Sequence, residues 1–382
     1  MVDLIGKLFT DGIIYLFLYL WLFFIAVLET CKEFNRYRIV LAFSSFILLS
    51  FFTGLRWETG TDWESYKELF DTLELDWTFL LNVYSFDLGY VLLNGIVKLV
   101  TSSYTVFLLI DSFLALGIIF LFLRKYSLNP NISFFVFYNA FFVAQFMGSN
   151  RRMIAMGAVL FSFYYIYESK KGKYAYWQTL AFLFHRTSFI AFFSWLIPRK
   201  RFSTKQVFTF LLITLCIGIP QLPFKMIGLV GSLFSSLTNN PLIEKMLFYS
   251  DSEHNLEVIS ENINPMIIMT LSVIKRSVFV TFYLTVIKRN KGLLDPISDY
   301  FFNIYIIGFG MYLLLNGSPI FQMMSTYFTF IEIALIGRFW AYTDKKIKLI
   351  FLCVLFFYGF FQLLSSLNAY PELYIPYRTF LS

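Results

Sequence analysis

Long apolar segments alternate with short polar ones along almost the whole chain. About 20 consecutive apolar residues form a helix long enough to cross a bilayer, so this pattern predicts an all-α, polytopic membrane protein. The pattern predicts about ten full crossings, over residues 12–28, 38–54, 105–123, 132–147, 153–167, 206–222, 264–287, 299–315, 325–342 and 346–367.

Clusters of lysine and arginine set the expected sidedness. The loop with Lys32, Arg36 and Arg38 follows the first span and is basic, so the positive-inside rule places it in the cytoplasm and the N-terminus outside. An even number of crossings then leaves the C-terminus outside as well. The segments at residues 55–104 and 224–262 become external, and each is expected to hold an amphipathic helix that lies on the membrane.

Residues 174–197 do not fit a single crossing. Lys170, Lys171 and Lys173 precede this apolar segment and Arg199-Lys200-Arg201 follows it, so both flanks favour the cytoplasm. Two half-length helices that meet near His185 and return satisfy both flanks. We therefore expect a re-entrant hairpin whose tip lines protein or a water-filled cavity.

Composition supports this class. The 382 residues are 58% hydrophobic, 21% aromatic and only 14% charged, against about 25% charged residues in soluble domains. We expect one integral membrane domain over residues 1–382. The net charge of +7 is explained by topology and needs no nucleic-acid partner, and the three cysteines have no CxxC spacing, so neither disulfides, a metal site nor a cofactor is expected.

The first external segment opens on a polar, aromatic run, residues 56–66. Thr61 and Glu64 have the spacing of a capping box, which predicts a helix to about residue 74. Its apolar positions would form a stripe on the membrane, namely Trp63, Tyr66, Phe70 and Leu73. Asp62 and Tyr66 are four residues apart and share one edge, where Asp62 either starts the helix or does chemistry. Arg56, at the mouth of the second span, is a candidate ligand for an anion.

Two further sets of candidates lie at the outer side. Asn150-Arg151-Arg152 opens a helix, where free N–H groups and two guanidinium groups suit a pyrophosphate, although arginines can also anchor to lipid headgroups. His185 at the hairpin tip is a candidate general base or phosphate donor, and the alternative is a packed core histidine.

Lys275-Arg276 lies in the middle of a predicted span, where charges are costly. Such residues face a cavity or an acid. They therefore form either a second anion site or an ion pair with Glu332 or Asp111, the other intramembrane charges.

These motifs together resemble the EpsG/Wzy-type polysaccharide polymerases. Residues 54–66, with Arg56-Trp57, Gly60-Thr61-Asp62-Trp63 and Tyr66, are similar to an R-[YW]-x-x-G-T-D-[YW]-x-x-Y pattern that follows the second span. The other segments similar to motifs of that family are Arg151 to Ala155, Ala181 to Ser188, Ser325 to Phe328 and Pro376-Tyr377. Two positions depart from the pattern: Arg152 stands where glutamine is usual, and Met323 where an arginine is frequent.

The resemblance implies a bacterial inner-membrane glycosyltransferase with a GT-C-like arrangement of spans. It would transfer a growing glycan from undecaprenyl pyrophosphate to the terminal sugar of an incoming lipid-linked unit, without a metal. Its expected partners are that oligosaccharide, membrane lipid, a chain-length regulator and a flippase. Under this reading Asp62 and His185 are catalytic, and Arg56, Tyr66, Arg151, Arg152, Lys275 and Arg276 bind substrate. A flippase or transporter of lipid-linked sugars and a multispan glycan acyltransferase are the alternatives.

Overall fold

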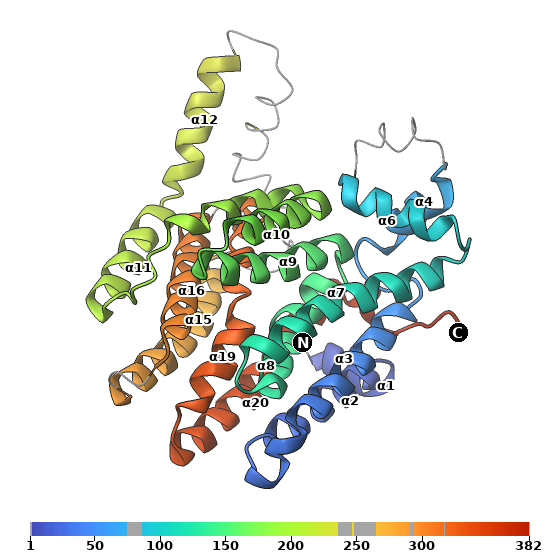
Figure 1. Cartoon of the computed structure of the whole chain (residues 1–382). Coiled ribbons are helices and arrows are strands. Elements are labelled where there is room, and N and C mark those ends of the chain that lie inside the picture. The colour runs from blue at the N-terminus through green and yellow to red at the C-terminus, as the bar shows by residue number, and fades with distance from the viewer. Residues whose placement is uncertain are drawn as a thin grey trace. The chain divides into compact units, whose positions relative to one another are not determined.

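The computed structural model describes residues 2–74, 86–235, 247, 265–290, 294–316 and 318–381. Within these ranges the chain is helical and contains no β-strand. It divides into two compact units: Met1–Phe192 with Ile333–Ser382, and Phe193–Glu332. Figure 1 shows the helices of both units. The expectation of one integral membrane domain stays a prediction.

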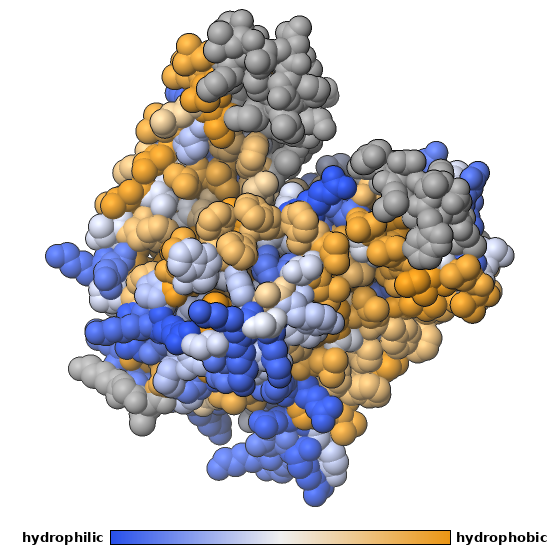
Figure 2. Space-filling model, turned by 45° about the horizontal axis from the view of Figure 1, so that its top comes forward, coloured by the Kyte–Doolittle hydropathy of each residue, from blue (hydrophilic) through white to orange (hydrophobic). Residues whose placement is uncertain are grey.

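Several helices suit a membrane. Among the described residues, four are long and apolar enough to cross one: Lys32–Gly54, Tyr104–Tyr126, Pro296–Leu314 and Lys345–Ala369. Thr204–Gly218 and Leu222–Val230, bent by 50° at a short break, would make a fifth if they form one span. Large apolar side chains are exposed on these helices, for example Phe357 and Phe361 at 62% each, and Figure 2 shows broad hydrophobic areas apart from groups of hydrophilic side chains. Such a surface is that of a membrane protein. The count of ten crossings and the GT-C-like arrangement stay predictions.

The first unit is built around α7 (Tyr104–Tyr126), which packs against α3 (Arg38–Gly54) and α9 (Asn150–Tyr167). Its aromatic side chains fill the contact with α3, where Phe46 stacks on Phe120 with ring centroids 5.3 Å apart. The unit also contains α1 (Val2–Thr10), α2 (Ile13–Leu28), η1 (Lys32–Tyr37), α4 (Trp63–Thr72), α6 (Leu88–Lys98), α8 (Pro130–Phe137), the π-helical η2 (Tyr138–Phe146), α10 (Lys171–Phe184), most of η3 (Arg186–Leu196) and of α19 (Glu332–Ala341), α20 (Lys345–Ala369) and α21 (Pro371–Tyr374).

The polar run forms its helix differently from the prediction. α4 begins at Trp63 after Asp62, and no side chain caps it, so the capping box of Thr61 and Glu64 was wrong. The Thr61 hydroxyl instead donates to the carbonyl of Gly148, 3.2 Å away. Thr61 was expected to cap α4, but its side chain forms a tertiary hydrogen bond to Gly148 instead.

The apolar stripe of α4 faces protein and not the membrane surface. Trp63, Tyr66, Phe70 and Leu73 are all at most 7% exposed. The Phe70 ring lies 5.2 Å from that of Phe107 on α7. On α6, the Lys98 ammonium donates to three carbonyls at the C-terminal end of α4, where a cation is favourable. The expectation of a membrane-facing stripe was wrong because α6 and α7 cover it.

The chain reverses direction at His185. α10 ends at Phe184, and a 3-10 segment, η3 (Arg186–Leu196), follows His185. The Gln178 amide donates to the carbonyl of Ser188 at 2.9 Å, and the Tyr174 hydroxyl to that of Phe192 at 2.6 Å. These bonds hold two antiparallel arms together, as a hairpin requires. Its re-entry into a membrane stays a prediction.

The second unit contains α11 (Thr204–Gly218), α12 (Leu222–Ser235), α15 (Pro265–Arg289), α16 (Pro296–Leu314), α17 (Pro319–Met324) and α18 (Thr326–Thr329). α11 begins with a capping box of Ser203 and Gln206 and packs against α16. The crossing expected over 325–342 is not one helix, because α18 ends at Thr329 and α19 (Glu332–Ala341) starts afresh. Most of the expected external segment beyond residue 235 lies outside the described residues, as do residues 75–85.

A C-terminal tail, residues 373–380, lies along the loop after α3 within the first unit. Three backbone hydrogen bonds join them: Trp57 to Arg378 at 2.9 Å, Gly60 to Leu373 at 3.0 Å, and Phe380 to Leu55 at 3.2 Å. Gly60 has φ of +112°, and a Cβ there would lie 2.2 Å from the carbonyl oxygen of Met147. Glycine is therefore required where the loop, the tail and the turn before α9 meet.

Candidate functional site

The candidate site lies at the N-terminal end of α9. A buried arginine, Arg56, holds this end of the helix in place. Arg56 is 1% exposed and follows the C-terminal end of α3. Its guanidinium donates to Asn150 Oδ1 at 2.6 Å and to the carbonyl of Thr53 at 3.0 Å. Because Asn150 is the first residue of α9, Arg56 fixes where that helix starts.

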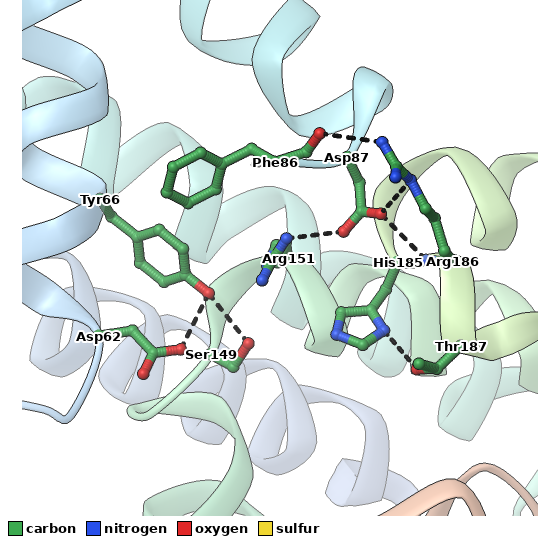
Figure 3. A network of polar contacts seen from close by, with 9 residues as sticks. All are labelled: Asp62, Tyr66, Phe86, Asp87, Ser149, Arg151, His185, Arg186 and Thr187. Carbon is green, nitrogen blue, oxygen red and sulfur yellow. Dashed lines mark hydrogen bonds and ion pairs between the residues drawn. The ribbon is translucent and has the colours of Figure 1, made fainter. Parts of the chain in front are cut away.

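The next residue of α9, Arg151, lies in a network with Asp87. Its NH1 donates to Asp87 Oδ2 at 2.8 Å. The other oxygen of Asp87, Oδ1, accepts a hydrogen bond from the backbone N–H of Arg186 at 3.2 Å and forms an ion pair with the Arg186 Nε, also 3.2 Å away. Asp87 precedes α6 and its side chain is 8% exposed, so one buried carboxylate joins α6, α9 and the hairpin tip (Figure 3).

Tyr66 forms the opposite side of this network. Its hydroxyl donates to Asp62 Oδ2 at 3.2 Å and shares a hydrogen bond of 3.0 Å with Ser149 Oγ. Burial and the charge of Asp62 raise the pKa of Tyr66 to about 12, so the phenol stays protonated. The predicted pairing of Asp62 with Tyr66 is confirmed, and in Figure 3 Arg151 lies between Tyr66 and Asp87.

His185 lies beside the arginines at the hairpin tip. Its Nδ1 is 2.6 Å from the Thr187 hydroxyl, which fixes the ring. Burial and the charges of Arg152 and Arg151 lower the pKa of His185 to about 3. The imidazole is therefore neutral at neutral pH, and an anion bound beside the arginines would raise its basicity. Arg152 itself donates to Gln145 Oε1 at 2.9 Å.

The structure brings six of the eight predicted site residues into the first unit: Arg56, Asp62, Tyr66, Arg151, Arg152 and His185. Arg56 is buried behind the start of α9. Asp62, Arg151, Arg152 and His185 are partly exposed.

Lys275 and Arg276, on α15, belong to the second unit. The Arg276 guanidinium lies 3.5 Å from the centroid of the Tyr312 ring. Both cations act electrostatically on Glu332, whereas Asp111 is in the other unit. Of the two acids proposed to neutralise them, Glu332 is therefore the one that interacts with them.

Sequence reasoning missed Asp87. It was one of eight acids between residues 55 and 90, and nothing in the spacing related it to Arg151 or Arg186. Its place directly before the apolar helix 88–98 is a helix-start signal that could have singled it out, because aspartate is favoured there. Arg186 lay inside a recognised motif, residues 181–188, and Ser149 lay just before Asn150, but neither residue had an assigned role.

The chemistry of these side chains suits an anion. Arg151 and Arg186 pair with one buried carboxylate, that of Asp87, and Arg152 follows Arg151 at the N-terminal end of α9, where its charge acts on His185. Arginine forks and helix N-termini both favour phosphate oxygens. Within the described residues, no group of three or more His, Cys, Asp or Glu side chains could hold a metal ion.

A comparison with protein-family models relates the chain to known proteins. The model described as the EpsG family matches residues 39–379, which include all of this site. That family is associated with glycosyltransferase-type polymerisation of polysaccharides. No curated protein and no solved structure matches the chain. The match extends over most of the sequence, and the chain therefore belongs to the EpsG family.

Proposed function

We propose that the protein polymerises lipid-linked oligosaccharide repeat units at the outer face of a bacterial cytoplasmic membrane. The growing glycan would leave undecaprenyl pyrophosphate and join the terminal sugar of an incoming lipid-linked unit. In this reaction an acceptor hydroxyl oxygen bonds to the anomeric carbon, the bond from that carbon to pyrophosphate breaks, and the hydroxyl proton passes to a base.

The observation that carries the proposal is the group of three arginines near the start of α9: Arg151 and Arg186 pair with Asp87, and Arg152 acts on His185. Negative charge builds up on the pyrophosphate as the bond to carbon breaks. Guanidinium groups that are already held in place stabilise this charge without reorganising during the reaction. Arg151 and Arg152 therefore bind the leaving group in this proposal.

The carboxylates take different roles. Asp87 accepts two hydrogen bonds, one each from Arg151 and Arg186, and forms ion pairs with both guanidinium groups, so it serves as an anchor and is a poor base. The carboxylate of Asp62 accepts a hydrogen bond from the Tyr66 hydroxyl, and the side chain is partly exposed. Asp62 is therefore the proposed base, with Tyr66 holding its orientation. His185 contributes a neutral imidazole that hydrogen-bonds either the acceptor hydroxyl or a phosphate oxygen.

Arg56 supports the site and does not contact substrate in this proposal, because it is only 1% exposed and is hydrogen-bonded to Asn150. Lys275 and Arg276 stay proposed as a second anion site. A chain-length regulator and a flippase are the proposed partners.

Changing His185 to alanine tests the reaction. We expect H185A to accumulate in membranes at wild-type level, yet to extend purified undecaprenyl-pyrophosphate-linked oligosaccharide about 100-fold more slowly, because general acid–base groups contribute at least that much. The measurement is the length distribution of glycan on gels. Long polymer from H185A at the normal rate would remove His185 from the mechanism.

The same assay separates a polymerase from a flippase. A polymerase lengthens lipid-linked units in detergent, where no second compartment exists. A flippase leaves their length unchanged there. Unchanged units with the wild-type protein would therefore reject the proposed function.

A further inference from the structure

The C-terminal tail, residues 373–380, has no role in the mechanism so far, although it lies along the loop of residues 55–60. Three backbone hydrogen bonds join the two segments. Arg378 of the tail adds two more contacts: its NH1 pairs with Glu58 Oε2 at 2.7 Å, and its backbone N–H donates to Thr59 Oγ1 at 3.4 Å. The tail therefore contacts the loop along its whole length.

The loop has a backbone shape that is unfavourable by itself. Glu58 has φ of +45° and Gly60 has φ of +112°. The left-handed region is uncommon for a residue with a side chain, such as Glu58. Such a conformation persists only where the surrounding structure enforces it, and it is frequent at active sites. The tail bonds to the loop before, at and after Glu58, so it is a structure that enforces this shape.

The tail is itself fixed to two helices of the first unit. The Tyr377 hydroxyl donates to the carbonyl of Phe52 on α3, and the two rings stack with their centroids 4.4 Å apart. The carbonyl of Tyr374 accepts from the hydroxyl of Tyr15 on α2 at 2.9 Å. Because α2 and α3 hold the tail, the tail can hold the loop in a fixed place relative to these helices.

The far end of the loop leads directly into the proposed base. The Thr61 hydroxyl bonds to the carbonyl of Gly148, and Asp62 follows at the start of α4. A Cβ at Gly148 would lie 2.9 Å from Thr61 Oγ1 and 3.6 Å from the Tyr374 hydroxyl, so the tail, the loop and the turn before α9 meet there. The position of the loop therefore sets the position of the Asp62 carboxylate relative to α9.

We propose that the C-terminal tail is a positioning element for Asp62, and that Arg378 is the side chain through which it acts on the loop. The tail keeps the strained loop in one conformation, and the loop keeps the carboxylate in a fixed place. This role rests on the proposed function in that Asp62 acts as the base, whereas the pairing of tail and loop stands apart from it. Arg56 has its own bonds to Thr53 and Asn150, so the start of α9 keeps its place without the tail.

The experiment reverses the ion pair of Glu58 and Arg378, whose side chains are each 53% exposed. E58R, R378E and the double variant E58R/R378E are compared as the purified full chain in detergent. The measurements are kcat and KM for extension of lipid-linked oligosaccharide, hydrogen exchange of the backbone amides of residues 57–60, and the Tm. K170E is the matched control, because it reverses another exposed ion pair, that of Lys170 with Glu168.

Each single reversal places two like charges where the ion pair stood, so we expect the amides of residues 57–60 to exchange about tenfold faster. The kcat should fall about tenfold, because a small displacement of a catalytic group slows the reaction. KM should stay within about twofold of the wild-type value, because Asp87 still holds the arginines in place.

The double variant restores an ion pair of opposite polarity and should recover most of both losses. The Tm of every variant should change by about 2 °C or less, since an exposed ion pair contributes little to stability. K170E should match the wild-type protein in all these quantities.

A wild-type kcat in R378E, together with faster amide exchange, would reduce the tail to a structural element and overturn its positioning role. Unchanged exchange in R378E, or a double variant no better than the single ones, would overturn the pairing of tail and loop. A raised KM with unchanged kcat would assign the effect to substrate binding and would also overturn the proposal. A wild-type protein that lengthens no glycan would instead reject the proposed polymerase, and amide exchange then tests the pairing of tail and loop by itself.

Discussion

R151A is expected to extend lipid-linked oligosaccharide about 100- to 1,000-fold more slowly than the wild-type protein, the loss usual when one charge-stabilising donor is removed. Arg151 is connected directly to Asp87 through a hydrogen bond and to Phe86 through its ring face. Its removal deprives the leaving pyrophosphate of a fixed cation. The measurement is the initial rate of glycan extension in detergent.

R151K and R124A are the controls. Lysine keeps the charge but cannot form the planar fork, so R151K should lie between the wild-type protein and R151A. Arg124 is an exposed cation in the last turn of α7, and R124A should extend glycan normally. Equal rates for R151A and R124A would remove Arg151 from the site.

D87N should also lower the rate about 100-fold, although Asp87 binds no substrate in the proposed mechanism. Its carboxylate forms ion pairs with both Arg151 on α9 and Arg186 at the hairpin tip. An amide cannot accept from both arginines as an anion does, so the two guanidinium groups lose their fixed positions. Displacement of a catalytic group by about 1 Å can cost that much.

D71N is the matched control for D87N, since Asp71 is an exposed carboxylate on α4 that pairs with Lys67. D87N protein that folds, as judged by an unchanged elution volume and Tm, but extends glycan at the wild-type rate would contradict the anchoring role of Asp87.

The sequence predicted the parts of the site that depend on local spacing. Asp62 and Tyr66 meet because they are one helical turn apart, and Arg151 and Arg152 lie at a helix start because a polar turn precedes an apolar run. The reversal near His185 followed from the basic residues on both flanks. Each of these predictions needed only a helical period or a charge count.

Tertiary contacts decided the rest. The Thr61 hydroxyl bonds to Gly148 and so does not cap α4, and the apolar stripe of α4 is covered by α6 and α7. Nothing local relates Asp87 to Arg186, which lies 99 residues away. The same holds for Arg56, whose partner Asn150 is 94 residues distant. Such pairings depend on how helices pack, which residue spacing alone does not determine.

The C-terminal tail affects how the site forms as well as how it is held. Arg378 also forms an ion pair with Glu58 across 320 residues of sequence, so the loop that carries Arg56 gains its last backbone partners from the far end of the sequence. Contacts between such distant residues form late, because a long stretch of chain must be ordered first. The loop that carries Arg56 is therefore complete only when residues from both ends of the sequence have come together.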